Sequence, residues 1–315
     1  MDRRCPLDDV LDVLRVRGSL SGYIRAHAPW GLTVPPVSGA AFHAVAVGGL
    51  WLRMPGRPAR ELLAGDLVLL PTGAEHIIAS DPSAATRPWD RAAKAKALDA
   101  SGEIVLKGTG RSTHVICAWY DYDHDVSHPL LSLLPRALVL SGHDAVETSP
   151  LQATLRLLRH ELAAGAAGSA TVIARLIDVL FVHVMREWIT RQHDHGASWL
   201  GALRDPSIGR ALTLMHSSPA APWTLASLAR EANVSRATLT RRFSALVGEA
   251  PLAYLTRWRM DLAARDLRET DHAVSAIAHR VGYASEFAFS RAFSRARGQP
   301  PGRYRTVARG RAATG

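Results

Sequence analysis

Cysteine is scarce in this sequence: 315 residues contain two, Cys5 and Cys117. Two cysteines cannot supply the several crosslinks of a disulfide-stabilised scaffold, so they favour a reducing compartment. Uninterrupted apolar runs are missing as well. The longest, TVIARLIDVLFVHVM, is broken by Arg175 and Asp178, and the first residues, MDRRCPLDDV, are charged where a signal peptide is apolar. These absences predict a cytoplasmic protein that does not contact membranes.

The sequence also lacks the short motifs of several enzyme classes. It has no P-loop, no dinucleotide-binding motif and no recognisable Ser/His/Asp arrangement. Hydrophobic residues, in contrast, make up 47% of the chain, which is enough for two ordinary domains with separate cores. We therefore expect a folded two-domain protein that is not an enzyme.

Lysine is absent from the last third of the chain, where arginine takes its place. From residue 198 onward there are 18 Arg and 8 Asp plus Glu, which gives 18 − 8 = +10, whereas residues 1 to 197 hold 20 basic and 20 acidic residues. Arginine suits bidentate contacts to phosphates and to guanine edges. A basic segment joined to a neutral one predicts nucleic-acid binding, and the alternative is a solvated basic surface.

This basic segment contains an internal repeat. SRATLTRRF at residues 235 to 243 returns at an offset of fifty residues as SEFAFSRAF at residues 285 to 293. Glycine, proline and tyrosine recur further along at the same offset. Such agreement in one order indicates a duplicated supersecondary unit. The matching pairs are Ser235 and Ser285, Arg241 and Arg291, Phe243 and Phe293, Gly248 and Gly298, Pro251 and Pro301, Tyr254 and Tyr304.

Each copy has the pattern of a helix-turn-helix. An apolar helical spacing is interrupted, and a serine, Ser235 or Ser285, is then placed to cap a second helix. On that second helix one face is apolar and predicted to be core, so the opposite face is free to enter a major groove. Phe287 on this face could touch a thymine methyl or close the helix pair. The residues predicted to contact double-stranded DNA are Arg236, Ala237, Thr240 and Arg241 in the first copy, and Glu286, Phe287, Ser290 and Arg291 in the second.

The repeat resembles the DNA-binding domain of the AraC/XylS family of transcription regulators over roughly residues 199 to 305. The likeness rests on WLGALRDPSIGRALTLMH, PWTLASLAREANVSRATLTRRF, YLTRWRM and VGYASEFAFSRAFSRARGQPPGRYR. It implies sequence-specific binding to promoter or operator DNA, and contact with RNA polymerase if the protein is an activator. Two helix-turn-helix motifs in one chain, here called the first and second reader, can occupy successive major grooves on one side of a duplex.

The N-terminal half consists of short runs of β-forming residues separated by glycine and proline, which predicts an antiparallel barrel or sandwich with few helices before residue 149. GDLVLLPTGAEH fits G-x5-P-x-G-x2-H and resembles the second half of the cupin signature. This resemblance extends over roughly residues 7 to 140 and implies a cupin-type sensor domain. The expected fold class is therefore α+β, a cupin-like barrel followed by helices and then an all-α domain with two helix-turn-helix motifs.

Several residues of the barrel are candidates for sensing. Metal-dependent cupins add an H-x-H pair and a glutamate to the later histidine, but AFHAVAVGGLWLRM supplies only His43. His43 and His76 could bind a divalent metal, bind a small-molecule effector together with Trp51, or simply hydrogen-bond within the barrel mouth. The resemblance also raises a redox role for Cys5 and Cys117, although a cysteine in the apolar strand VICAWY is commonly buried and inert.

These features predict three regions: a sensor domain over 1–145, a helical dimerisation or linker region over 146–197, and a DNA-binding domain over 198–309. The amphipathic helices of the middle region could pack on the barrel or pair with a second chain in a homodimer. Residues 80–112 look like a long insertion over the barrel mouth. The sequence thus favours an effector- or redox-controlled transcription regulator, and the alternative is a metal-dependent cupin enzyme with a basic accessory domain.

Overall fold

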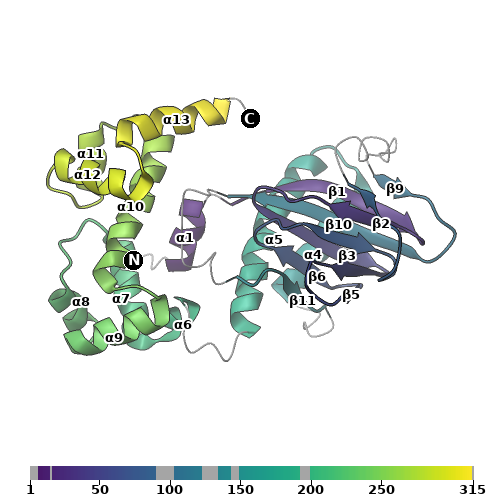
Figure 1. Cartoon of the computed structure of the whole chain (residues 1–315), viewed down its shortest axis with the longest axis horizontal. Coiled ribbons are helices and arrows are strands. Elements are labelled where there is room, and N and C mark those ends of the chain that lie inside the picture. The colour runs from purple at the N-terminus through teal and green to yellow at the C-terminus, as the bar shows by residue number, and fades with distance from the viewer. Residues whose placement is uncertain are drawn as a thin grey trace. The chain divides into compact units, whose positions relative to one another are not determined.

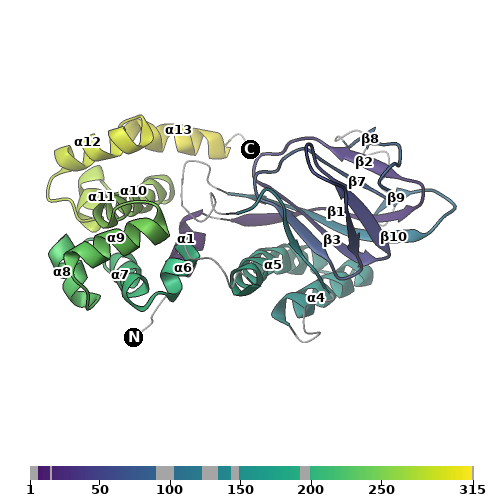
Figure 2. The same cartoon turned by 60° about the horizontal axis from the view of Figure 1, so that its bottom comes forward.

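The computed structural model describes residues 6–14, 16–89, 103–122, 134–142, 149–191 and 199–313. These residues form two compact units, shown from two sides in Figures 1 and 2. The helical unit contains residues 6–14 and 199–313, and the β unit contains the other described residues.

Two sheets build the β unit. Among the described residues, the six-stranded sheet has the order β11-β6-β3-β10-β1-β9 and the five-stranded sheet the order β5-β4-β7-β2-β8. Most neighbours are antiparallel; β9 beside β1 and β8 beside β2 are parallel. The strands are β1 (Arg17–His27), β2 (Gly31–Val34), β3 (Ala40–Val47), β4 (Gly49–Arg53), β5 (Arg60–Leu63), β6 (Leu67–Leu70), β7 (His76–Ala79), β8 (Arg87–Pro88), β9 (Ile104–Leu106), β10 (Ser112–Asp121) and β11 (Leu138–Leu140).

Strand β3 shows why both faces of the larger sheet are buried. Successive side chains of a strand point to opposite faces. Ala41 and Val45 join the apolar core to which both sheets contribute. Phe42 points the other way, where its ring centroid lies 6.1 Å from that of Tyr120. The Tyr120 ring in turn lies 4.9 Å from Phe181 of a covering helix. The core is therefore continued on the outer face of this sheet.

Helices α4 (Pro150–Ala164) and α5 (Ser169–Arg191) form that cover and lie side by side in both views (Figures 1 and 2). The Gly18 amide donates to Asp178 Oδ1 at 2.8 Å, and the Tyr120 hydroxyl donates to the Ile177 carbonyl at 3.1 Å. A Cβ at Gly18 would lie 2.2 Å from Ile177 Cγ2, so this close approach of strand and helix needs glycine. Of the two packing arrangements left open by the sequence, the structure contains the one against the barrel.

The helical unit carries the repeat. Its helices are α1 (Pro6–Leu14), α6 (Trp199–Arg204), α7 (Pro206–Ser217), α8 (Leu225–Glu231), α9 (Arg236–Val247), α10 (Pro251–Glu269), α11 (Val274–Arg280), α12 (Glu286–Arg297) and α13 (Pro301–Ala313). Helices α8 and α9 form the first helix-turn-helix, and α11 and α12 form the second. The long helix α10 joins them.

The two copies begin and end their second helix in the same way. The side chain of Ser235 accepts from the Thr238 amide, and that of Ser285 accepts from the Ala288 amide, as the predicted N-caps require. Both helices end at a left-handed glycine, Gly248 with φ 84° and Gly298 with φ 71°, a conformation that side chains with a Cβ rarely adopt. Each glycine therefore stops its helix, as expected.

The turns between the paired helices differ by one residue. Asn233 has φ 55° and its amide donates to the Arg230 carbonyl three residues back. Gly282 has φ 84° and donates to the His279 carbonyl in the same way, but it lies 49 rather than 50 residues further along. The second turn thus contains one more residue before its capping serine. The repeat is conserved in geometry while its spacing shifts locally.

Helix α1 corrects the predicted organisation. Few helices were expected before residue 149, and residues 6–14 were assigned to the sensor domain, whereas α1 packs on α7 and α10 of the helical unit. Its contact side consists of Leu7, Val10 and Val13, which are 8%, 1% and 1% exposed. This i, i+3 apolar spacing was visible in PLDDVLDVL, although the charges around it obscured it.

The other predicted core residues and regions are confirmed only in part. The apolar face predicted as core is buried at Phe243 and Phe293. Trp258 and Tyr304 are buried as well, whereas Trp223 is only half-buried. Helices α4 and α5 of the predicted separate middle region belong to the β unit. Cys5 lies outside the described residues, as do residues 90–102 of the predicted insertion at 80–112. Within the described ranges, no helix has both the length and the apolar character needed to cross a bilayer.

Candidate functional site

The residues predicted to contact DNA lie on the open sides of α9 and α12. Their apolar neighbours on the same helices face inward: Leu239, Phe243, Phe289 and Phe293 are all 0% exposed. The predicted contact residues are exposed, except that Thr240 and Ser290 are half-buried. The structure therefore presents two helix faces of the predicted composition, built on the same turn and cap chemistry.

The arginines of α9 differ in whether they form ion pairs. Within the part of the chain that the structure describes, Arg236 and Arg241 take part in no ion pair. Arg242, the next residue, is different because it pairs with Asp205, the N-cap of α7. Two guanidinium groups thus remain available on the exposed face of α9, while a third is used to hold the helix against α7.

On α12 the exposed face is mixed. Phe287 is 72% exposed, and the guanidinium carbon of Arg291, one turn further, lies 5.8 Å from the centre of its ring. Such a geometry is a cation–π contact. Glu286 at the start of the helix adds a negative charge near the positive helix N-terminus, where it is favourable. The exposed faces of α9 and α12 therefore differ in charge and in apolar character.

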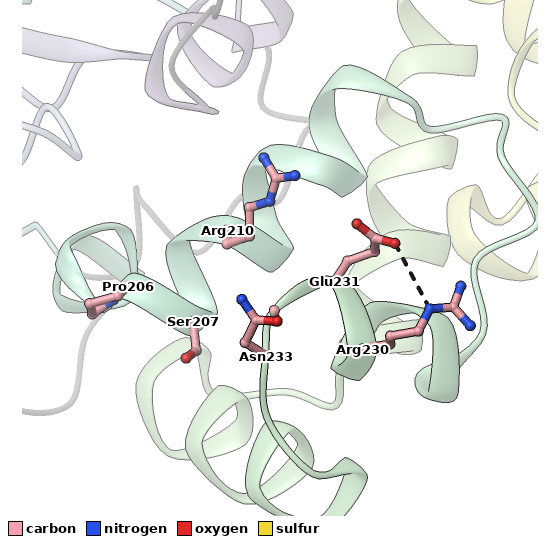
Figure 3. A pocket seen from close by; sticks show the side chains of 7 residues that line it. Pro206, Ser207, Arg210, Arg230, Glu231 and Asn233 are labelled. Carbon is pink, nitrogen blue, oxygen red and sulfur yellow. Dashed lines mark ion pairs between the residues drawn. The ribbon is translucent and has the colours of Figure 1, made fainter.

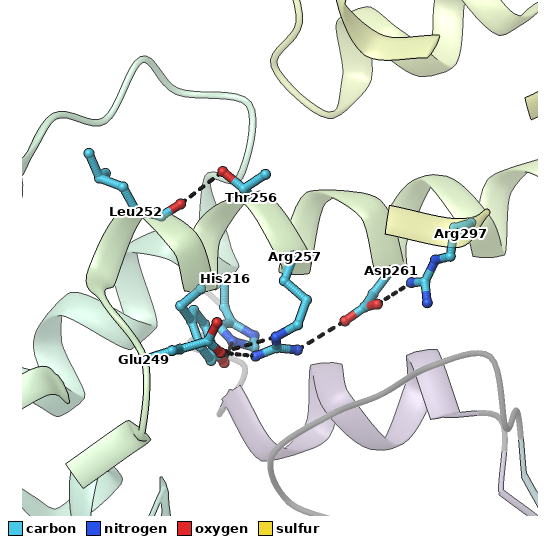
Figure 4. A network of polar contacts seen from close by, with 8 residues as sticks. His216, Glu249, Leu252, Thr256, Arg257, Asp261 and Arg297 are labelled. Atoms are coloured by element: carbon cyan, nitrogen blue, oxygen red, sulfur yellow. Dashed lines mark hydrogen bonds and ion pairs between the residues drawn. The ribbon is translucent and has the colours of Figure 1, made fainter. Parts of the chain in front are cut away.

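A buried ionic network connects the two helix-turn-helix motifs through α10 (Figure 4). Asp261 of α10 is 0% exposed and pairs with Arg297 of α12 and, at 3.3 Å, with Arg257. Arg257 also pairs with Glu249 at 2.7 Å, in the segment between α9 and α10. Because buried charges are tolerated only when paired, this chain of contacts fixes α12 relative to the end of α9. It therefore also fixes the separation of the two helix faces that were predicted to contact DNA.

The first helix-turn-helix also borders a polar pocket that the sequence analysis missed. The pocket has a volume of about 500 Å³ and lies between the start of α7 and the turn after α8 (Figure 3). Arg210, Arg230 and Ser207 line it, together with Glu231, which lies 4.0 Å from Arg230. Two exposed arginines at one pocket favour an anionic group there. Only the excess of arginine in the sequence pointed in this direction.

In the β unit, three of the predicted sensor residues come together. His76 Nδ1 lies 2.8 Å from the Ala74 carbonyl, so this nitrogen carries a proton and Nε2 of the same ring accepts. His43 Nε2 lies 2.8 Å from His76 Nε2 and must be the donor. His43 Nδ1 then accepts, at 3.1 Å, from the Cys117 thiol. The hydrogen bonds thus assign both tautomers and leave the thiol protonated.

His43 and His76 are both neutral. Burial holds the pKa of His43 well below its ordinary value, and the neighbouring His76 lowers it further. Burial also lowers the pKa of His76, against smaller raising effects from the Ala74 carbonyl and Glu75. In this arrangement the ring nitrogens bind each other, and the described residues contain no group of three or more His, Cys, Asp or Glu side chains that could hold a metal. At His43 and His76 the structure thus shows the hydrogen-bonded arrangement, one of the three alternatives that the sequence left open.

Trp51 does not belong to that cluster. Leu50 and Leu52 of β4 enter the core, so Trp51 between them lies on the opposite face of the five-stranded sheet. There it lines an open cleft of about 580 Å³, whose walls include Glu61 and Arg111 but neither His43 nor His76. The predicted effector set of His43, Trp51 and His76 is therefore split between the interior and the outer face.

Comparisons with known proteins agree with both halves of this description. Residues 6–190 match a family described as Cupin, and residues 228–306 match a family described as Helix-turn-helix domain. A Streptomyces lividans protein described as an AraC-like transcription regulator is 38% identical over 303 residues, which cover 95% of this chain and 97% of that protein. The HTH-type transcriptional regulator AlkR of Acinetobacter baylyi is 29% identical over 313 residues, with 95% and 98% covered.

Among solved structures, the DNA-binding domain of AdpA in complex with a target DNA is 33% identical, with a TM-score of 0.34; the match covers 35% of this chain and 99% of that chain. The family match and the Streptomyces relative define the class. The chain belongs to the AraC-like transcription regulators, with a cupin domain followed by a helix-turn-helix DNA-binding domain.

Proposed function

We propose that this regulator reads a two-part operator through α9 and α12, under the control of a small-molecule effector bound in the β unit. The main support is the pair of exposed helix faces, each with an arginine at the same repeat position, Arg241 and Arg291. The buried network through Asp261 supports a fixed spacing between them. Such a spacing suits successive major grooves of one duplex.

DNA binding to fragments of the neighbouring genome, with excess competitor DNA, tests this proposal. Arg241→Ala and Arg291→Ala should each lose tight, competitor-resistant binding, because each removes an exposed cation from a predicted groove-facing surface. Arg242→Ala is the matched control, since it removes the same charge from α9 but at a side chain that pairs with Asp205. Equal loss in all three variants would indicate a general basic surface instead.

We infer that Arg210 and Arg230 bind backbone phosphates beside the first reader. The support is the polar pocket that they line, next to the turn of the first helix-turn-helix. Phosphate contacts position a protein on DNA without specifying sequence. These residues would therefore add affinity at every site rather than preference for one.

We propose the Trp51 cleft as the effector site. An aromatic side chain flanked by Arg111 and Glu61 suits a planar compound with one anionic and one hydrogen-bond-donating group. The interior residues His43, His76 and Cys117 already bind one another, which favours the outer cleft. With 4-aminobenzoate as the first probe, ligand-induced thermal stabilisation should occur in the parent and be lost in Trp51→Ala. A redox role for Cys117 remains a prediction, with a buried, protonated thiol against it.

We also propose a homodimer through α4 and α5. After these helices cover the barrel, Val172 and Val179, each 42% exposed, share one face of α5, and Leu157 of α4 is 56% exposed. A second copy of the same face would bury these side chains in a two-fold interface. Sedimentation equilibrium should find a dimer for the parent and a monomer for Val179→Glu. RNA polymerase is a further partner if the protein activates transcription.

A further inference from the structure

We propose that Phe287 is a specificity-determining residue that reads the methyl group of a thymine in the second half of the operator. This inference rests on the proposed insertion of α12 into a major groove. It adds the chemistry that the second reader recognises and the reason why the two half-sites differ.

Phe287 does not belong to the apolar core of the helical unit. The other two phenylalanines of α12, Phe289 and Phe293, are fully buried and belong to the apolar core around α10. Phe287 is 72% exposed, on the opposite side of the helix. Apolar side chains gain free energy when they leave water, at roughly 25 cal/mol per Å². An exposed aromatic ring on this face of α12 would therefore gain free energy if a binding partner covered it.

The ring is also held in place. Arg291 lies one helical turn beyond Phe287, with its guanidinium carbon 5.8 Å from the ring centre. This contact restrains both side chains before DNA is bound and so reduces the entropy lost on binding. It leaves Arg291 directed along the same face, where a guanine edge or a phosphate is its expected partner.

The chemistry of the groove identifies the base. A phenyl ring offers no hydrogen bond, and the C5-methyl of thymine is the apolar group that a base pair presents in the major groove. At the corresponding positions of the first reader stand Ala237 in place of Phe287 and Arg236 in place of Glu286. The exposed face of α9 thus has a smaller apolar side chain at this position and a more positive charge than that of α12. The two halves of the operator should differ accordingly, with the thymine contact specific to the second.

Replacement of thymine by deoxyuridine tests this directly, because it removes the methyl and keeps the base pair. An operator is first enriched from random DNA with the full-length protein, and each thymine of each half is then replaced in turn. One replacement in the second half should weaken binding by the parent about fourfold, which corresponds to about 0.8 kcal/mol for a methylene-sized group. Phe287→Ala should bind the thymine operator equally weakly and be insensitive to that replacement.

Two controls separate the alternatives. Phe287→Leu keeps an apolar group and should retain part of the thymine preference, and Phe287→Ala should leave the melting temperature unchanged because the ring is exposed. A flat deoxyuridine series in the parent, or the same sensitivity in Phe287→Ala, would overturn the thymine role. The role would also be overturned if Phe287→Ala bound the operator with normal affinity but no longer regulated transcription, because Phe287 would then contact a protein partner. Failure to enrich any operator would instead contradict the proposed two-part reading itself.

Discussion

At the scale of single residues, Asp261 combines complete burial with two arginine partners, Arg257 and Arg297. Removal of one member of a buried ionic group leaves the others uncompensated, which costs about 3 to 5 kcal/mol. Asp261→Asn should therefore lower the free energy of unfolding by about that much, measured by denaturant titration. Glu249→Gln, at the half-exposed end of the same network, should cost much less; equal losses would contradict the importance of burial.

The two neutral histidines predict a pH dependence. Burial lowers the folded-state pKa of His43 and of His76, so below the unfolded value of 6.5 the unfolded chain binds more protons than the folded one. Their contribution to stability is present above pH 6.5 and is lost as the pH falls. The melting temperature should decline on acidification from pH 7.

A variant isolates this contribution. His114 and His183 also have a pKa lowered by burial, so some decline will remain without the interior pair. His43→Gln should be less stable than the parent at pH 7, yet its melting temperature should fall less steeply with pH. A decline as steep as that of the parent would mean that other groups carry the whole effect.

At the scale of elements, α1 is the piece whose assignment has measurable consequences. Val10 is 1% exposed and faces the helical unit, so Val10→Ala should destabilise that unit by roughly 2 kcal/mol through the cavity it leaves. Calorimetry of the full chain should show the shift in the transition of the helical unit. Ile78→Val, in the core of the β unit, is the counterpart and should shift the other transition.

The same scale separates what the sequence could reveal from what it could not. Ser235 and Ser285 as caps, and Phe243 and Phe293 as core, follow from local spacing and were predicted. The contact between His43 and Cys117 was not predicted, because the two residues are paired by the register of β3 and β10 across more than seventy residues of chain. Strand register depends on long-range packing, which a single sequence does not reveal. The Trp51 cleft was hidden for the same reason.

At the scale of the whole molecule, the positive charge of the helical unit predicts a strong salt dependence of DNA binding. Each phosphate contact contributes about −0.9 to the slope of log K against log salt. Arg210→Ala or Arg230→Ala should reduce the slope by about one and weaken operator and competitor DNA alike. Arg241→Ala should instead reduce the preference for the operator. Titrations at four salt concentrations distinguish the two outcomes, and unchanged slopes would contradict the phosphate role.

The position of α1 also limits how the chain can be divided. Leu7, Val10 and Val13 complete the packing surface of α7 and α10, although the entire β unit intervenes in the sequence. A fragment that begins at residue 198 lacks these side chains and exposes the surface they cover. Chimaeras joined in the segment after α5 would combine the first helix of one regulator with the reader of another. Exchange of intact sensors therefore requires a second junction, between α1 and β1.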